Sequence, residues 1–70
     1  MRVLLHLTEP SGEASTAADM ELPAAPRVGD MVQVLLPDGS PLQLTVNSVL
    51  WDLRDTEAPT VYVWGLEDKP

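Results

Sequence analysis

Three short apolar runs with turn residues between them constrain the fold of this chain more than any other feature. They cover residues 31–36, 42–51 and 60–66. None has the periodicity of an amphipathic helix, whereas Val, Leu and aromatic residues bounded by Pro, Gly and Asp are typical of β-strands. The two links, 37–41 and 52–59, are too short to hold a further domain element. The sequence therefore predicts an all-β fold.

The middle run contains a break in its alternation. From Leu42 to Val46 apolar and polar residues alternate, but Val49 and Trp51 continue the apolar set on the opposite parity. One additional residue at positions 47–48 restores a single apolar face, which is what a β-bulge does. We therefore expect a bulge or sharp bend there, with Trp51 turned inward.

The N-terminal half contains weaker strand signals. Residues 2–8 alternate and are expected to form a strand, and residues 20–22 a short edge strand. Residues 9–19 mix turn residues with small polar ones, which favours a long loop. Gly29 and Gly39 stand in Pro- and Asp-containing segments, where a positive φ reverses the chain.

A chain of 70 residues accommodates one domain with one core. About five strands joined by short turns predict a small antiparallel barrel or a strongly curled sheet, SH3-like in layout, with an OB-like barrel as the alternative. The domain is expected to span residues 1–70 and to end in a frayed polar tail at 67–70.

The charge balance narrows the possible partners. Eleven acidic residues against four basic ones give a formal net charge of −7. Nucleic acids and anionic membranes are bound through Lys and Arg, so both partners are disfavoured. The acidity either serves solubility or docks a basic partner protein. Because no segment resembles a membrane span or an export signal, a cytoplasmic location is expected.

The residues that perform catalysis or bind metals are scarce. His6 is the only imidazole and there is no cysteine, so neither a general base with an oriented partner nor a zinc site is expected. Asp52, Asp55 and Glu57 share one segment, but it lacks the glycine of a calcium loop and contains Arg54 as a counter-charge. The sequence therefore predicts no enzyme, no metal and no cofactor.

The aromatic residues of the last run offer a contact surface. Tyr62 and Trp64 share a parity opposite to Val61 and Val63, so they form either an exposed aromatic patch or the second side of a curled sheet. Together with the charged segment before them they make up the predicted partner-binding residues: Asp52, Arg54, Asp55, Glu57, Tyr62 and Trp64.

Three functions follow as hypotheses. The first is a non-enzymatic protein-binding module or small acidic inhibitor of a basic partner, such as a phage- or plasmid-type regulator of a host nucleic-acid enzyme. Its contact surface would include a wider acidic rim, formed by Glu9, Glu13, Asp19 and Glu21. The second is a homodimer that pairs exposed edges, either residues 20–22 or residues 60–66. The third, an OB-like nucleic-acid binder, is opposed by the charge.

The arrangement of turns and strands also resembles a protein family. Residues 26–30 (Pro-Arg-Val-Gly-Asp), the pair Asp38-Gly39 and the valine-rich segments 46–51 and 61–63 resemble small bacterial and phage β-barrel proteins of uncharacterised function, over residues 20–66. The layout is also similar to SH3-type barrels, although the clustered aromatics and Trp-Trp pair of their ligand groove are missing. The resemblance implies a fold and no activity, so no functional residues are assigned from it.

Overall fold

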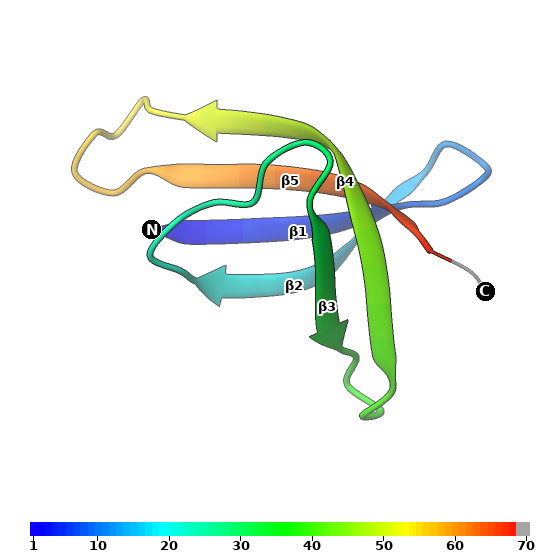
Figure 1. The fold of residues 1–70 in the computed structure, drawn as a ribbon. Helices are drawn as coiled ribbons and strands as arrows, with labels where there is room; N and C mark the ends of the chain where they lie inside the picture. Colours follow the sequence, from blue (N-terminus) through cyan, green and yellow to red (C-terminus); the bar gives the residue numbers. More distant parts are fainter. Residues whose placement is uncertain (69–70) are drawn as a thin grey trace.

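Five β-strands form one sheet in this computed structural model, which describes residues 1–68 (Figure 1). The described residues contain no helix. The strands lie side by side in the order β2-β1-β5-β4-β3. Their bounds are Arg2–Thr8 (β1), Ala14–Glu21 (β2), Met31–Leu35 (β3), Pro41–Asp52 (β4) and Thr60–Glu67 (β5).

The sheet is mixed, which corrects the expectation of a purely antiparallel one. β1 and β5 pair in parallel, from Arg2 opposite Thr60 to Leu7 opposite Gly65, while the other three pairs are antiparallel. Parallel neighbours need a long connection between them. Here the connection is everything from β2 to β4, so no hairpin dictates the relative direction of the first and last strands.

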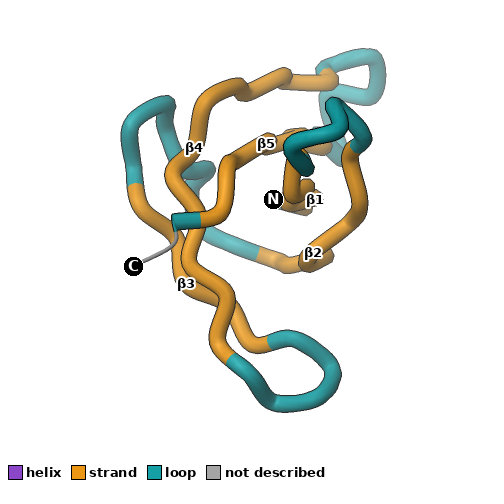
Figure 2. The backbone as a smooth tube through the Cα atoms, turned by 90° about the vertical axis from the view of Figure 1, so that its right-hand side faces the viewer, coloured by secondary structure: helices purple, strands orange, loops and turns teal. Residues whose placement is uncertain are grey.

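The sheet curls strongly into a half-barrel (Figure 2), which confirms the all-β class in its curled-sheet form. β4 makes the bend: its first half pairs with β3 and its second half with β5. The register of β4 against β5 shifts between Val46 and Ser48, so Asn47 is the additional residue. The predicted bulge is therefore present, and β2 and β3 form the two edges of an open sheet.

The predicted long loop at 9–19 is wrong over most of its length. β2 begins at Ala14, and only a tight turn closed by Glu9 and Gly12 separates it from β1. A second register shift, opposite Leu5 and His6, leaves Ala17 unpaired in β2. The small polar residues of β2 have weak strand propensity, so it is pairing with β1 that holds this segment extended.

The core lies on the concave side of the sheet. Seven aliphatic side chains there are at most 5% exposed, and the described residues bury no polar or charged side chain with them. Strands β1, β4 and β5 supply the seven at alternating positions, as period-two burial requires, and residues of β2 and β3 pack against them. They are Val3, Leu5, Leu42, Leu44, Val46, Val61 and Val63.

Trp51 is turned to the concave side, as expected, but it is not buried in the core. It has the parity of Val49, as the bulge requires, and pairs with Val61, but 49% of it is exposed. Trp51 stands near the end of β4, next to the last residue of that strand. Correct parity therefore placed this ring on the concave side, but the sheet is too short at this end to cover it.

The turns and the C-terminal end agree partly with expectation. Gly29 and Gly39 have the predicted positive φ, 95° and 86°. Residues 67 and 68 of the predicted frayed tail are held in place, because Glu67 is still in β5 and Asp68 accepts hydrogen bonds of 2.8 and 3.0 Å from the Thr45 hydroxyl. Residues 69–70 lie outside the described residues.

Candidate protein-binding face

The convex side of the half-barrel presents three rows of side chains that cross strands β1, β5 and β4. The register of the parallel and antiparallel ladders places these residues opposite one another, and their alternation with the buried valines turns them outward. We call this surface the convex face. Its rows are Arg2-Thr60-Asp52, Leu4-Tyr62-Leu50 and His6-Trp64-Ser48.

The second and third rows contain a cluster of three stacked rings, His6, Tyr62 and Trp64. The ring centroids of His6 and Trp64 are 5.5 Å apart, and Tyr62 lies 6.2 Å from each of them. The interplanar angles are between 8° and 27°, so the rings are nearly parallel. All three side chains are half-buried, which leaves part of each ring open to a ligand.

Two arginine–aspartate pairs stand at the first-row end of the convex face. Arg2 donates from Nε and Nη2 to both carboxylate oxygens of Asp19 on β2, over 3.1 and 2.9 Å. Arg54 donates in the same way to Asp52, over 3.0 and 2.8 Å. Such two-point pairs fix the orientation of both partners. The charged end of the face is therefore ordered.

The ion pairs shift the acidity of their carboxyl groups. The Arg54 guanidinium, followed by the backbone N–H of the same residue, lowers the pKa of Asp52 to about 2. Arg2 lowers the pKa of Asp19 in the same direction, chiefly by its hydrogen bonds. In return, the hydrogen bonds to Asp19 and Asp52 raise the pKa of the Arg2 and Arg54 guanidinium groups.

The six predicted partner-binding residues lie on the convex face or in the loop beside its first row. Tyr62 and Trp64 lie on the convex face, Asp52 occupies its first row, and Arg54 is paired to Asp52. Asp55 and Glu57 are exposed in the loop that follows β4, where the Asp55 carboxylate accepts the backbone N–H of Glu57 over 3.1 Å.

The wider acidic rim is divided between two ends. Asp19 and Glu21 lie beside the first row, with Glu21 accepting from the N-terminal ammonium group over 2.8 Å. Glu9 and Glu13 lie at the opposite end of β1, in the turn to β2. They therefore do not belong to the charged end of the convex face.

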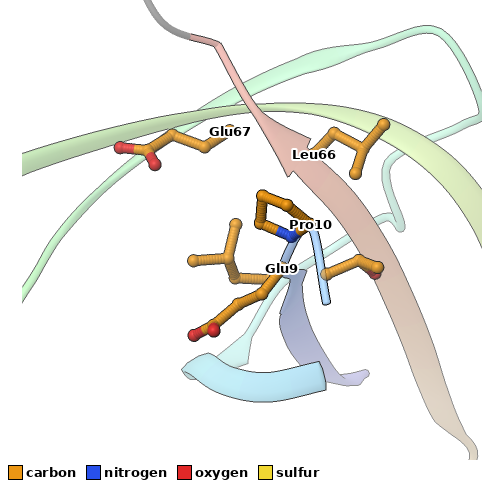
Figure 3. Close-up of a pocket in the computed structure, with 6 residues that line it drawn as sticks. Glu9, Pro10, Leu66 and Glu67 are labelled. Atoms are coloured by element: carbon orange, nitrogen blue, oxygen red, sulfur yellow. The ribbon is translucent and has the colours of Figure 1, made fainter. Parts of the chain in front are cut away.

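Glu9 instead lines a hollow of about 540 Å³ at the carboxyl ends of β1 and β5 (Figure 3). Leu7, Thr8, Pro10 and Leu66 form most of its wall, and the side chains of Glu9 and Glu67 extend to the same side of it. Its lining is apolar with a carboxylate margin.

Sequence reasoning missed His6, Leu4 and Leu50 as members of the face. Each of the three alternates with inward-facing apolar residues in its own strand, so the alternation was enough to predict that its side chain points outward. Nothing in the sequence revealed that β1 lies beside β5, however, because that contact joins the two ends of the chain. The same pairing makes residues 60–66 a central strand, so their prediction as an exposed edge is wrong.

The described part of the chain holds neither a metal-binding cluster nor a membrane-spanning helix. Residues 1–68 contain no group of three or more His, Cys, Asp or Glu side chains placed to hold a metal ion. Nor do they contain a helix that is long and apolar enough to cross a membrane. No protein-family model, curated protein or solved structure significantly matches this chain.

Proposed function

We propose that this chain is a non-enzymatic binding module that docks a basic partner protein on the convex face. The observation that carries the proposal is the stacked cluster of His6, Tyr62 and Trp64 on an outward-facing surface, beside an acidic end. Trp and Tyr are the side chains most often responsible for binding energy at protein interfaces.

The geometry of the cluster favours binding because its side chains lose little conformational entropy when a partner binds. The three rings are already stacked on two hydrogen-bonded central strands. Ordering a mobile side chain at an interface costs about 0.5 to 1.5 kcal/mol, and this cost is reduced where the side chain is held in place beforehand. Leu50, which is 55% exposed, extends the apolar area beside Tyr62.

The charges indicate the chemistry of the partner. Arg2 and Arg54 neutralise Asp19 and Asp52, but the nearby loop adds Asp55 and Glu57 without a cation paired to either among residues 1–68. The whole chain is acidic, with a net charge of −7. A basic surface is therefore attracted, and an arginine of the partner could stack on Trp64 or Tyr62 as a cation–π contact.

Affinity capture with matched surface variants tests the proposal. The immobilised chain is exposed to lysate of its source cells, and retained proteins are identified and assayed individually by calorimetry. We expect a basic protein that the wild type and Leu35→Ala bind equally, and that a Tyr62→Ala/Trp64→Ala double variant binds at least tenfold more weakly. Leu35 is a suitable control because it is 72% exposed on β3, away from the cluster.

Salt provides the second readout. Raising ionic strength from about 0.05 M to about 0.5 M shortens the screening length severalfold and should weaken the complex. A partner that binds the double variant as tightly as the wild type would refute the convex face as the contact surface. An acidic partner, or one indifferent to salt, would refute the proposed charge complementarity.

A homodimer is the second candidate, and one observation favours it. β2 is an edge strand of eight residues, and Asp19 and the terminal Glu21 are its only charged side chains. Such an edge can pair with a second copy of itself. Sedimentation velocity at micromolar concentration decides: a monomer at all concentrations excludes this alternative, whereas a dimer disrupted by Ala18→Pro on β2 supports it.

A further inference from the structure

A second hollow, of about 480 Å³, lies at the end of the sheet where β1 begins and β4 ends. Its walls come from the start of the chain, the proline-containing link between β2 and β3, and the concave side of β4. We call it the proline hollow. It is lined by Met1, Pro23, Ala24, Ala25, Pro26, Arg27, Val28, Val49 and Trp51.

The floor and walls of the proline hollow are apolar and accessible. Trp51 is 49% exposed and Val28 65%, and both side chains line the hollow. The bulge in β4 is the reason that Trp51 is on this side, since without the register shift it would turn to the convex face. The hollow is of the size that holds small organic ligands, typically about 300 to 1,000 Å³.

Arg27 has the only charged side chain among the residues that line the proline hollow. Its backbone N–H donates to Asp30 over 2.8 Å, but its guanidinium group makes no hydrogen bond or ion pair within residues 1–68. The other described cations are all paired: Arg2 with Asp19, Arg54 with Asp52 and the N-terminal ammonium with Glu21. A guanidinium has five N–H donors, and those of Arg27 are available to a ligand.

No carboxylate lines the proline hollow, although the chain has eleven acidic residues. The nearest ones in the sequence are already engaged: Glu21 with the N-terminal ammonium and Asp30 with the backbone of Arg27. The hollow therefore combines apolar walls with a cation in an otherwise acidic molecule. That combination is complementary to an apolar molecule with one anionic group.

We infer that the proline hollow binds a small monocarboxylate with an apolar body. The body lies against Trp51, Val28 and Val49, and the carboxylate accepts from the Arg27 guanidinium. Arginine and a carboxylate match in geometry and can form two parallel hydrogen bonds. This site is on the opposite side of the sheet from the convex face, so it does not rest on the proposed protein-binding function.

Fluorescence of Trp51 measures the binding directly. A Trp64→Phe variant leaves Trp51 as the only tryptophan, and the chain is titrated with octanoate, a carboxylate with an unbranched apolar body. We expect a saturable change in emission at millimolar octanoate or below. Octylammonium, which has the same apolar chain and the opposite charge, should give no saturable change.

Variants at position 27 test the role assigned to the guanidinium group. Arg27→Gln should weaken octanoate binding about fivefold, the upper end of what an exposed ion pair contributes. Arg27→Lys keeps the charge and should retain most of the affinity, and Leu35→Ala on β3 should bind as the parent does. Circular dichroism and thermal unfolding establish that each variant is folded.

Two outcomes overturn the inference. If octanoate causes no saturable change up to about 10 mM, its dissociation constant is above the millimolar range that we count as binding, and the hollow is not a carboxylate site. If octanoate binds equally to the parent and Arg27→Gln, or if octylammonium binds as well, the hollow is an unselective apolar surface. Chemical-shift changes in the Trp51 indole N–H identify the site independently, because octanoate held elsewhere would leave that resonance unmoved.

Discussion

Gly65 on β5 lies so close to β4 that a Cβ atom at position 65 would be 3.0 Å from the carbonyl oxygen of Thr45. It would also be 3.1 Å from the Cβ of Leu44, a fully buried core residue. Gly65 pairs with Val46, immediately before the register shift at Asn47. The absence of a side chain therefore allows the two strands to approach closely where β4 bends across the sheet.

Gly65→Ala should destabilise the fold by about 1 to 3 kcal/mol, since the crowded atoms include backbone that cannot rotate away. Urea denaturation followed by tryptophan fluorescence measures this loss. A Gly39→Ala variant is the comparison: apart from the residue itself and its two chain neighbours, no atom lies within 4 Å of that added Cβ, but φ is +86°. Amide resonances of Leu44 and Thr45 should move in Gly65→Ala and stay in place in Gly39→Ala. A Gly65→Ala protein as stable as the wild type would contradict the close packing.

The core is small enough that one truncation should remove a large share of the free energy of unfolding. Leu44→Ala removes a side chain that is 0% exposed, and such changes cost about 2 to 5 kcal/mol. A domain of 70 residues has roughly 4 to 10 kcal/mol in total. Leu35→Ala, at a position 72% exposed, should change stability by less than about 0.5 kcal/mol. Equal effects of the two variants in chemical denaturation would contradict the assignment of the core to the concave side.

Acid should weaken the fold through Asp52. Its pKa is about 2 in the folded protein and about 3.9 in an unfolded chain. A carboxyl group with a lowered folded pKa stabilises the fold above pH 4, and this contribution disappears as the pH falls from about 4 to about 2. Asp19 and Asp38, whose pKa values are also lowered, add to the effect in the same direction.

Side-chain carboxyl NMR titration of Asp52 checks this assignment. In Arg54→Gln the pKa of Asp52 should rise toward its ordinary value but stop short of it, because the backbone N–H of residue 54 still donates to the carboxylate. Asp38, which is held by Ser40 and not by an arginine, should keep its lowered pKa in this variant. An unchanged titration of Asp52 would show that the ion pair does not form in solution.

The sequence predicted the local features of the fold well because each was encoded within a short segment. The shift of parity between Val46 and Val49 was sufficient to locate the bulge, and the Gly-containing turns were recognisable from their own residues. The candidate site was predicted only in part. Tyr62, Trp64 and the charged segment beside them were recognised, since they lie within about a dozen residues of one another.

The features that the sequence did not predict depend on contacts between distant segments. β2 has few strand-forming residues, and it is extended because β1 supplies its hydrogen-bonding partners. The parallel contact of β1 with β5 joins opposite ends of the chain and brings His6 onto Trp64. Neither segment alone carries information about that pairing, so the three residues that β1 adds to the convex face could not be placed there from periodicity.

The contact of His6 with Trp64 should be measurable as an interaction energy. The two residues pair across β1 and β5 with ring centroids 5.5 Å apart. A double-mutant cycle with His6→Ala and Trp64→Ala should give a coupling of about 0.5 to 1.5 kcal/mol in the free energy of unfolding, the range for stacked aromatic pairs. The cycle of His6→Ala with Leu35→Ala is the control, because β1 and β3 are not neighbours in the sheet. Its coupling should be zero within about 0.3 kcal/mol.

A His6–Trp64 coupling no larger than that control would mean that the rings do not stack in solution. The convex face would then lack the ordered cluster on which partner binding is proposed to depend.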